Sequence, residues 1–163
     1  MILKYLKKKE NKEQIIATEQ YKQILYESKN FLSNNNFFKV KDYKTSFEIV
    51  SIFLIMFIRK NLIEKNRKKY LKVNDELLSL FISDLDESLR EKGIGDMSIG
   101  KYVKSYVKKF YFRISKFPID NNLYQNESFI EYLKLTKLIK NDDYINVSRK
   151  FNDKFSQLIN PIN

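Results

Sequence analysis

Apolar residues recur at every third or fourth position along almost the whole chain, which is the spacing of one face of an α-helix. The first such stripe comprises Ala17, Tyr21, Ile24 and Phe31, and it predicts a helix over residues 12–30. No stretch alternates apolar and polar residues between turn signals, so the pattern predicts no sheet. The length of 163 residues suits one domain. We therefore expect an all-α single domain of about six helices.

The second expected helix is the most apolar. It opens at Thr45 with a capping box, in which the Thr45 hydroxyl accepts from the Glu48 amide and the Glu48 carboxylate reaches back. From Ile49 to Ile58 it is apolar nearly all round, as a central helix is. This run spans about 15 Å, too little to cross a hydrocarbon core of about 30 Å. A linker over residues 37–44 precedes it and is expected to place two phenylalanines on the core. The remaining helices are expected from about Asn74 to the glycines, then over 99–117, 127–140 and 143–159.

All three glycines, at 93, 95 and 100, fall within eight residues. Gly93 is expected just past the end of the third helix, where a positive φ costs a glycine no steric strain. Leu89 and Ile94 then make the hydrophobic contact of a Schellman motif. Gly95 permits an immediate turn, and Gly100 suggests the close approach of another backbone. This spacing predicts a tight corner between two helices that requires no ligand.

The residues around the corner add a cap and a set of charges. Ser98 is expected to cap the fourth helix, with Met97 in a hydrophobic staple. Asp96 then stays in the loop, free to accept backbone amides or meet a basic partner. Asp86 and Arg90 have the spacing of an ion pair on one helix. We also expect the acidic face of the third helix to lie opposite the basic face of the fourth helix, so that their charges pair.

Composition excludes several kinds of site. The chain has no Cys and no His, which excludes disulfides, thiolate metal sites, serine–histidine triads and HExxH zinc sites. The segment from Gly95 to Lys101 has the spacing of a phosphate loop, but Tyr102 stands where Ser or Thr is required, and a helix precedes it instead of a strand. Asp84 and Asp86 form a pair of carboxylates, but the chain has no histidine that could complete a catalytic or two-metal site with them. We expect no metal, no cofactor, no small-molecule substrate and no enzymatic activity.

The net charge suggests an anionic neighbour. Lys and Arg number 31 against 20 acidic residues, a net charge of +11. Basic stretches cover residues 1–12, 59–72 and 101–116. Nucleic acid, a ribosome or an acidic membrane surface fits such stretches, while a general bias toward Lys, Asn and Ile produces the same charge with no partner. A basic helical module that binds nucleic acid or the ribosome is therefore one candidate function.

A longer pattern runs through the corner, in the segment from Leu80 to Arg113. Its matching positions are Phe81, Asp84, Asp86, Leu89, Arg90, Glu91, Gly93, Gly95, Asp96, Gly100, Lys101, Val103, Lys104, Phe110, Tyr111 and Arg113. At these positions the chain resembles the ubiquinol–cytochrome c chaperone family of mitochondria and alphaproteobacteria. Weaker similarity extends upstream through Thr45 to Arg59, and Phe112 stands where the family usually has Gly.

The resemblance implies a non-enzymatic assembly factor. It would bind newly made cytochrome b as its client and support the biogenesis of ubiquinol–cytochrome c reductase (complex III). Its expected partners include a small helical co-chaperone and the ribosome or an anionic membrane surface. Its expected location is peripheral to the inner membrane, on the cytoplasmic side in a bacterium or the matrix side in a mitochondrion. Residues 1–163 would form one domain, with a signature segment at 78–117 and a basic extension at 1–12.

The resemblance also implies which residues contact the client or a partner. They are Asp84, Asp86, Leu89, Arg90, Gly93, Gly95, Asp96, Gly100, Lys101, Lys104, Phe110, Tyr111 and Arg113. Where on the folded chain a client groove lies is not implied.

Overall fold

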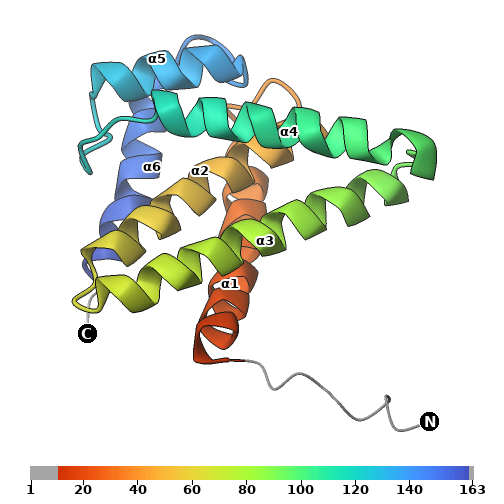
Figure 1. Cartoon of the computed structure of the whole chain (residues 1–163). Helices are drawn as coiled ribbons and strands as arrows, with labels where there is room; N and C mark the ends of the chain where they lie inside the picture. Colours follow the sequence, from red (N-terminus) through yellow and green to blue (C-terminus); the bar gives the residue numbers. More distant parts are fainter. Residues whose placement is uncertain (1–10, 162–163) are drawn as a thin grey trace, which may run out of the picture.

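The computed structural model describes residues 11–161, and in that part of the chain it contains six α-helices and no sheet (Figure 1). The helices are α1 (Lys12–Asn34), α2 (Tyr43–Ile63), α3 (Arg67–Glu91), α4 (Asp96–Lys116), α5 (Glu127–Thr136) and α6 (Tyr144–Ile159). The expected all-α single domain is confirmed. The expected basic extension lies almost wholly outside the described residues.

Helix α2 is the centre of the fold, as its apolar run predicted. It packs against α1, α3, α4 and α6, and every residue from Ser51 to Phe57 is buried. Helices α3 and α4 form a long antiparallel pair along one side, while α5 and α6 close the other side (Figure 1). Within residues 11–161, no helix is both long enough and apolar enough to cross a membrane.

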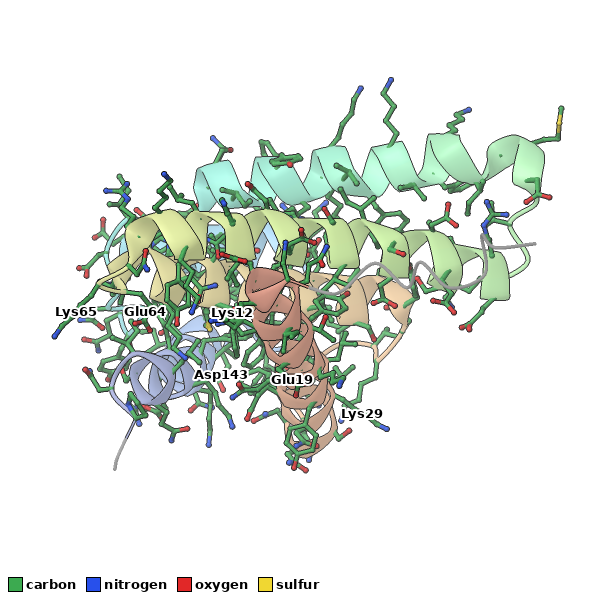
Figure 2. The ribbon with its side chains drawn as sticks, turned by 60° about the horizontal axis from the view of Figure 1, so that its bottom comes forward. Lys12, Glu19, Lys29, Glu64, Lys65 and Asp143 are labelled. Carbon is green, nitrogen blue, oxygen red and sulfur yellow. The ribbon has the colours of Figure 1, made fainter. Side chains whose placement is uncertain are left out.

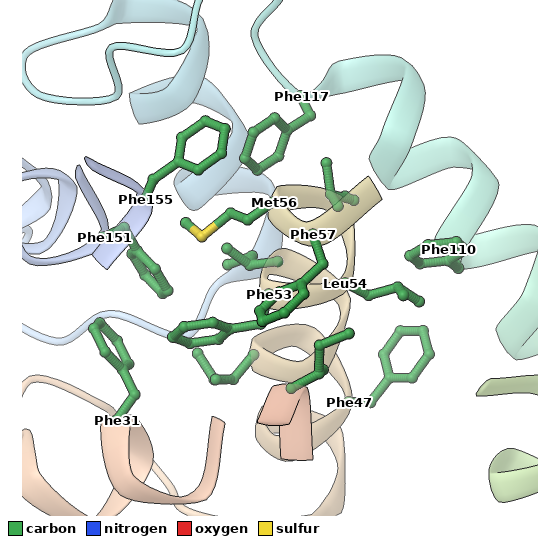
Figure 3. Packing of buried hydrophobic residues seen from close by; sticks show 14 of the residues in the cluster. Phe31, Phe47, Phe53, Leu54, Met56, Phe57, Phe110, Phe117, Phe151 and Phe155 are labelled. Atoms are coloured by element: carbon green, nitrogen blue, oxygen red, sulfur yellow. The ribbon is translucent and has the colours of Figure 1, made fainter. Parts of the chain in front are cut away.

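Aromatic rings fill the space between α2 and the C-terminal helices (Figure 3). The rings of Phe31 and Phe151 stack with their centroids 4.3 Å apart, and Phe53 meets Phe31 edge-on. Phe38, from the linker before α2, is buried against the same cluster and Phe37 packs beside it, as expected. Such pairs contribute about 0.5–1.5 kcal/mol beyond the area they bury, so they fix how α1 and α6 sit on α2.

The start of α2 differs from the expected capping box. Its cap is Asp42, whose carboxylate accepts from the Thr45 amide at 2.9 Å. The Thr45 hydroxyl donates to the carbonyl of Val40 at 2.7 Å. Glu48 does not reach back to the helix start, because its buried carboxylate binds residues of α4. Because Glu48 pairs with residues of α4, its carboxylate is not available to cap the start of α2.

Two other helix boundaries also differ from expectation. Helix α3 begins at Arg67, capped by the side chain of Asn66, whereas Asn74 lies buried inside the helix and hydrogen-bonds Asn61. Helix α5 ends at Thr136 rather than near residue 140, because the chain turns to the left-handed region at Lys137. The segment after it then pairs with residues 37–39 through two backbone hydrogen bonds of 2.8 and 2.9 Å.

Candidate functional site

The corner between α3 and α4 is a Schellman motif, as the glycine spacing predicted. Gly93 has a φ of +90°, which only glycine adopts without strain. Its amide donates to the Arg90 carbonyl at 2.9 Å, and the Ile94 amide donates to the Leu89 carbonyl at 3.1 Å. Both hydrogen bonds satisfy carbonyls that the end of a helix leaves unpaired.

The start of α4 contradicts three expectations. The helix begins at Asp96 after Gly95, with no side-chain cap, so Ser98 is not the capping residue. Met97 is fully exposed and forms no hydrophobic staple. No atom lies within 4 Å of the position that a Cβ on Gly100 would occupy, so no backbone approaches it closely. An acid in the first turn is favoured by the helix dipole, which is consistent with a start at Asp96.

Arg90 ties the two helices together at the corner. Its guanidinium binds Asp86 at 2.6 Å, the expected pair, and also binds Asp96 across the turn. The hydrogen bonds that Arg90 donates to Asp86 and Asp96 raise its pKa. Asp96 is therefore neither in the loop nor free. In residues 11–161 this is the one ion pair between α3 and α4, so the expected matching of their charged faces does not occur.

A buried charge cluster joins α2, α4 and α5. Both oxygens of Glu48 accept from Arg113, at 2.9 Å from Nε and 2.8 Å from Nη2, and Lys109 adds a contact of 2.8 Å. Arg113 also donates to the carbonyl of Leu135 at 3.3 Å. Burial acts to lower the pKa of Arg113, but the hydrogen bonds and charge of Glu48 outweigh it and raise that pKa. Arg113 is therefore a buried structural tie between helices.

A largely apolar groove lies between α1, α2 and α3, and the α3 residues that line it belong to the signature segment. Its larger part has a volume of about 200 Å³, and a neighbouring part of about 140 Å³ shares three of its residues. The larger part is lined by Leu25, Tyr43, Ser46, Phe47, Val50, Phe81, Asp84, Leu85 and Ser88. We refer to the two parts together as the apolar groove.

Polar groups mark one end of the apolar groove. The Asp84 carboxylate accepts from the Tyr21 hydroxyl at 2.7 Å, and the Tyr43 and Ser88 hydroxyls lie 2.9 Å apart. Burial, followed by the hydrogen bond and charge of Asp84, raises the pKa of Tyr21, so its hydroxyl stays protonated and donates. One signature carboxylate is thus oriented at the edge of an apolar surface.

The thirteen expected contact residues do not form one site. Leu89, Phe110 and Arg113 are buried in the fold, whereas Asp86, Arg90, Gly93, Gly95 and Asp96 build the corner. Gly100, Lys101, Lys104 and Tyr111 are exposed on α4. Asp84 alone lines the apolar groove.

The sequence reasoning missed the remaining residues of the apolar groove. Tyr43, Phe47 and Val50 begin the most apolar helix at three- and four-residue spacing, and this spacing is the signal by which they could have been found. Leu25 borders the buried stripe of α1, four residues after Tyr21, but it was not part of the stripe that the sequence predicted. Phe112, which replaces the family's usual Gly, has a half-exposed ring, so solvent accommodates the larger side chain.

Comparison with known proteins bears on the same region. The family model described as "Ubiquinol-cytochrome C chaperone" matches residues 38–118, which contain α2, α3 and α4. A solved structure titled "Crystal structure of the Cbp3 homolog from Brucella abortus" has a TM-score of 0.67 and 21% sequence identity. The similarity covers 91% of this chain and 83% of that chain, and it shows a shared fold. No curated protein matched this chain.

Proposed function

Since the chain belongs to the ubiquinol–cytochrome c chaperone family, we propose that it binds newly made cytochrome b as its client during assembly of ubiquinol–cytochrome c reductase. Cytochrome b is a membrane protein, and its apolar segments need cover before they reach their final partners. The protein acts by binding alone, with no chemical step.

The apolar groove is the observation that supports this proposal most directly. It is open on the surface and lined by apolar side chains from three helices. Leu25 lines both parts of the apolar groove beside Val50, and its side chain is 37% exposed. Exposed apolar surface of this kind is a feature of binding grooves. An apolar client segment would gain about 25 cal/mol for each Å² of apolar surface that it buries there.

The polar end of the apolar groove gives the bound segment a direction. Asp84 is held in place by Tyr21 at 2.7 Å and retains acceptor capacity for a backbone amide or a basic side chain of the client. Ser46 and Ser88, which also line the apolar groove, are further donors and acceptors. An apolar floor with a few oriented polar groups is the usual composition of a binding site.

A crosslinking experiment tests both the client and its location. A photoreactive amino acid replaces Val50 in the apolar groove, or Ile145 on α6 as a control, since Ile145 is exposed and lies outside the apolar groove. Each protein is present while cytochrome b is synthesised. We expect crosslinks to cytochrome b from position 50 and none from position 145. Absence of crosslinks from position 50, or equal crosslinks from both positions, contradicts the proposal.

A matched pair of substitutions provides a second measurement. Leu25→Asp introduces a charge at the rim of the apolar groove, and Ile145→Asp introduces the same charge on α6. Both side chains are partly exposed, so both variants should fold with the helical content of the wild type. Leu25→Asp should lower the amount of cytochrome b that is captured, while Ile145→Asp should leave it unchanged.

A further inference from the structure

The outward side of α4 carries cations and apolar side chains without internal partners. Residues 97, 101, 104, 108, 112 and 115 follow helical spacing and are all exposed. They are Met97, Lys101, Lys104, Lys108, Phe112 and Ser115, and we refer to them as the α4 outer face. Long side chains ending in nitrogen project from this side of α4, away from the other helices (Figure 2). None of these residues belongs to the apolar groove.

The three lysines of this face are not neutralised within the described part of the chain. Lys109 and Arg113, on the inner side of α4, bind Glu48, and Asp96 binds Arg90. Across residues 11–161 no carboxylate pairs with Lys101, Lys104 or Lys108. Like charges one helical turn apart repel each other, so a partner with negative charge would remove an unfavourable interaction.

The apolar members of the face indicate what kind of anion it meets. Phe112 is 48% exposed, Met97 is fully exposed, and Ile119, just beyond the end of α4, is 94% exposed. Lysines with long apolar stems, together with exposed aromatic and aliphatic side chains, are features of helices that lie in the headgroup region of a membrane. The α4 outer face has no Arg, so it lacks the planar guanidinium that recognises nucleic acid by bidentate and stacking contacts, whereas Lys meets a phosphate as a point charge.

We propose that the α4 outer face docks on an anionic lipid bilayer, with α4 lying along the membrane surface. The ammonium groups contact lipid phosphates, while Phe112 and Met97 enter the headgroup region. This goes beyond client binding, because it concerns a surface that the apolar groove does not share. It leaves the apolar groove accessible to a client beside the membrane.

Vesicle binding by the purified protein tests this proposal without any client. The probes are vesicles of phosphatidylcholine alone and of phosphatidylcholine mixed with phosphatidylglycerol. Binding is expected only to the anionic vesicles and should weaken with salt. Each basic residue near an anionic surface contributes about 1 kcal/mol, so K101Q/K104Q/K108Q should lower the partition coefficient roughly 100-fold. Phe112→Ser should lower it further.

The matched control is K65Q/K68Q/K72Q, which removes the same charge from exposed lysines just before α3 and in its first two turns. It should lower the partition coefficient much less than the α4 variant does. Equal losses in both variants, or no binding to anionic vesicles, overturn the proposal. Binding to RNA with no binding to vesicles also overturns it and favours the ribosome instead. Because the assay contains no cytochrome b, none of these outcomes bears on the client proposal.

Discussion

Removing Arg113 is expected to cost about 3 kcal/mol of unfolding free energy, because Glu48 would then be a buried acid without its main partner. Glu48 is only 1% exposed, and two of its three charged contacts come from Arg113. Breaking a buried ion pair costs about 3–5 kcal/mol. Lys109 stays within 2.8 Å of Glu48, which places the expected loss for Arg113→Met at the lower end of that range.

A double-mutant cycle separates this interaction from the general effect of substitution. Glu48→Gln alone leaves Arg113 buried without a counter-ion and should also cost about 3 kcal/mol or more. The double variant E48Q/R113M buries neither charge, so its loss should be smaller than the sum of the single losses by about 1–3 kcal/mol. Urea unfolding followed by circular dichroism measures all four proteins, with similar m-values expected.

Two results would refute the reasoning. A loss of less than 1 kcal/mol for R113M, or strictly additive single losses, would show that Glu48 and Arg113 are not coupled. If R113M instead kept its stability and lost client capture, Arg113 would be a contact residue, as the resemblance alone implied. Lys109→Met is the control and should cost less than R113M, because the Lys109 side chain is more exposed.

Four further substitutions test the local structure. Gly93→Ala should lower the unfolding free energy by about 1–2 kcal/mol because φ is positive there. Gly100→Ala, with open space around it, should raise the unfolding free energy by about 0.5–1 kcal/mol. Urea unfolding measures both variants, and a loss of stability in each would contradict the prediction for Gly100. Asp42→Ala should cost about 1 kcal/mol. Hydrogen bonds from Thr45 lower the pKa of Asp42, so the cap is at full strength above the ordinary Asp pKa and weakens as pH falls through the lowered value. The unfolding free energies of the wild type and of Asp42→Ala should therefore converge as the pH falls into the acid range. A difference that stays constant with pH would be inconsistent with a titrating cap. Tyr21→Phe should cost about 1 kcal/mol by removing the donor to Asp84, and an unchanged melting temperature would argue against that bond.

The sequence predicted the helices well because apolar spacing reports burial locally. The order of the six helices and the central place of α2 follow from that pattern. The start of α2 does not, because Asp42 and Thr45 are both acceptable caps. In the structure Asp42 is the cap, and Glu48, which a Thr45 capping box would require, instead binds Arg113, far along the chain.

The candidate site likewise has one part that the sequence predicts and one part that it does not. The Schellman motif at Gly93 uses neighbouring residues, so its hydrogen bonds were predictable from spacing. The apolar groove depends on how three helices pack, and Leu25 meets Val50 there only after folding. The resemblance likewise marked thirteen residues as contacts without distinguishing those that hold the fold from those on its surface. Only the packed structure assigns Arg113 to the interior and Lys101 to solvent.

The spectrum of b-type haem in cells without this protein tests the central proposal most directly. Deletion should abolish or strongly reduce the b-type haem absorbance of ubiquinol–cytochrome c reductase, together with ubiquinol oxidation. The wild-type gene should restore both, and so should Ile145→Asp, whereas Leu25→Asp should restore them poorly. If cytochrome b accumulates and ubiquinol oxidation is normal after deletion, the protein is not the assembly chaperone proposed here.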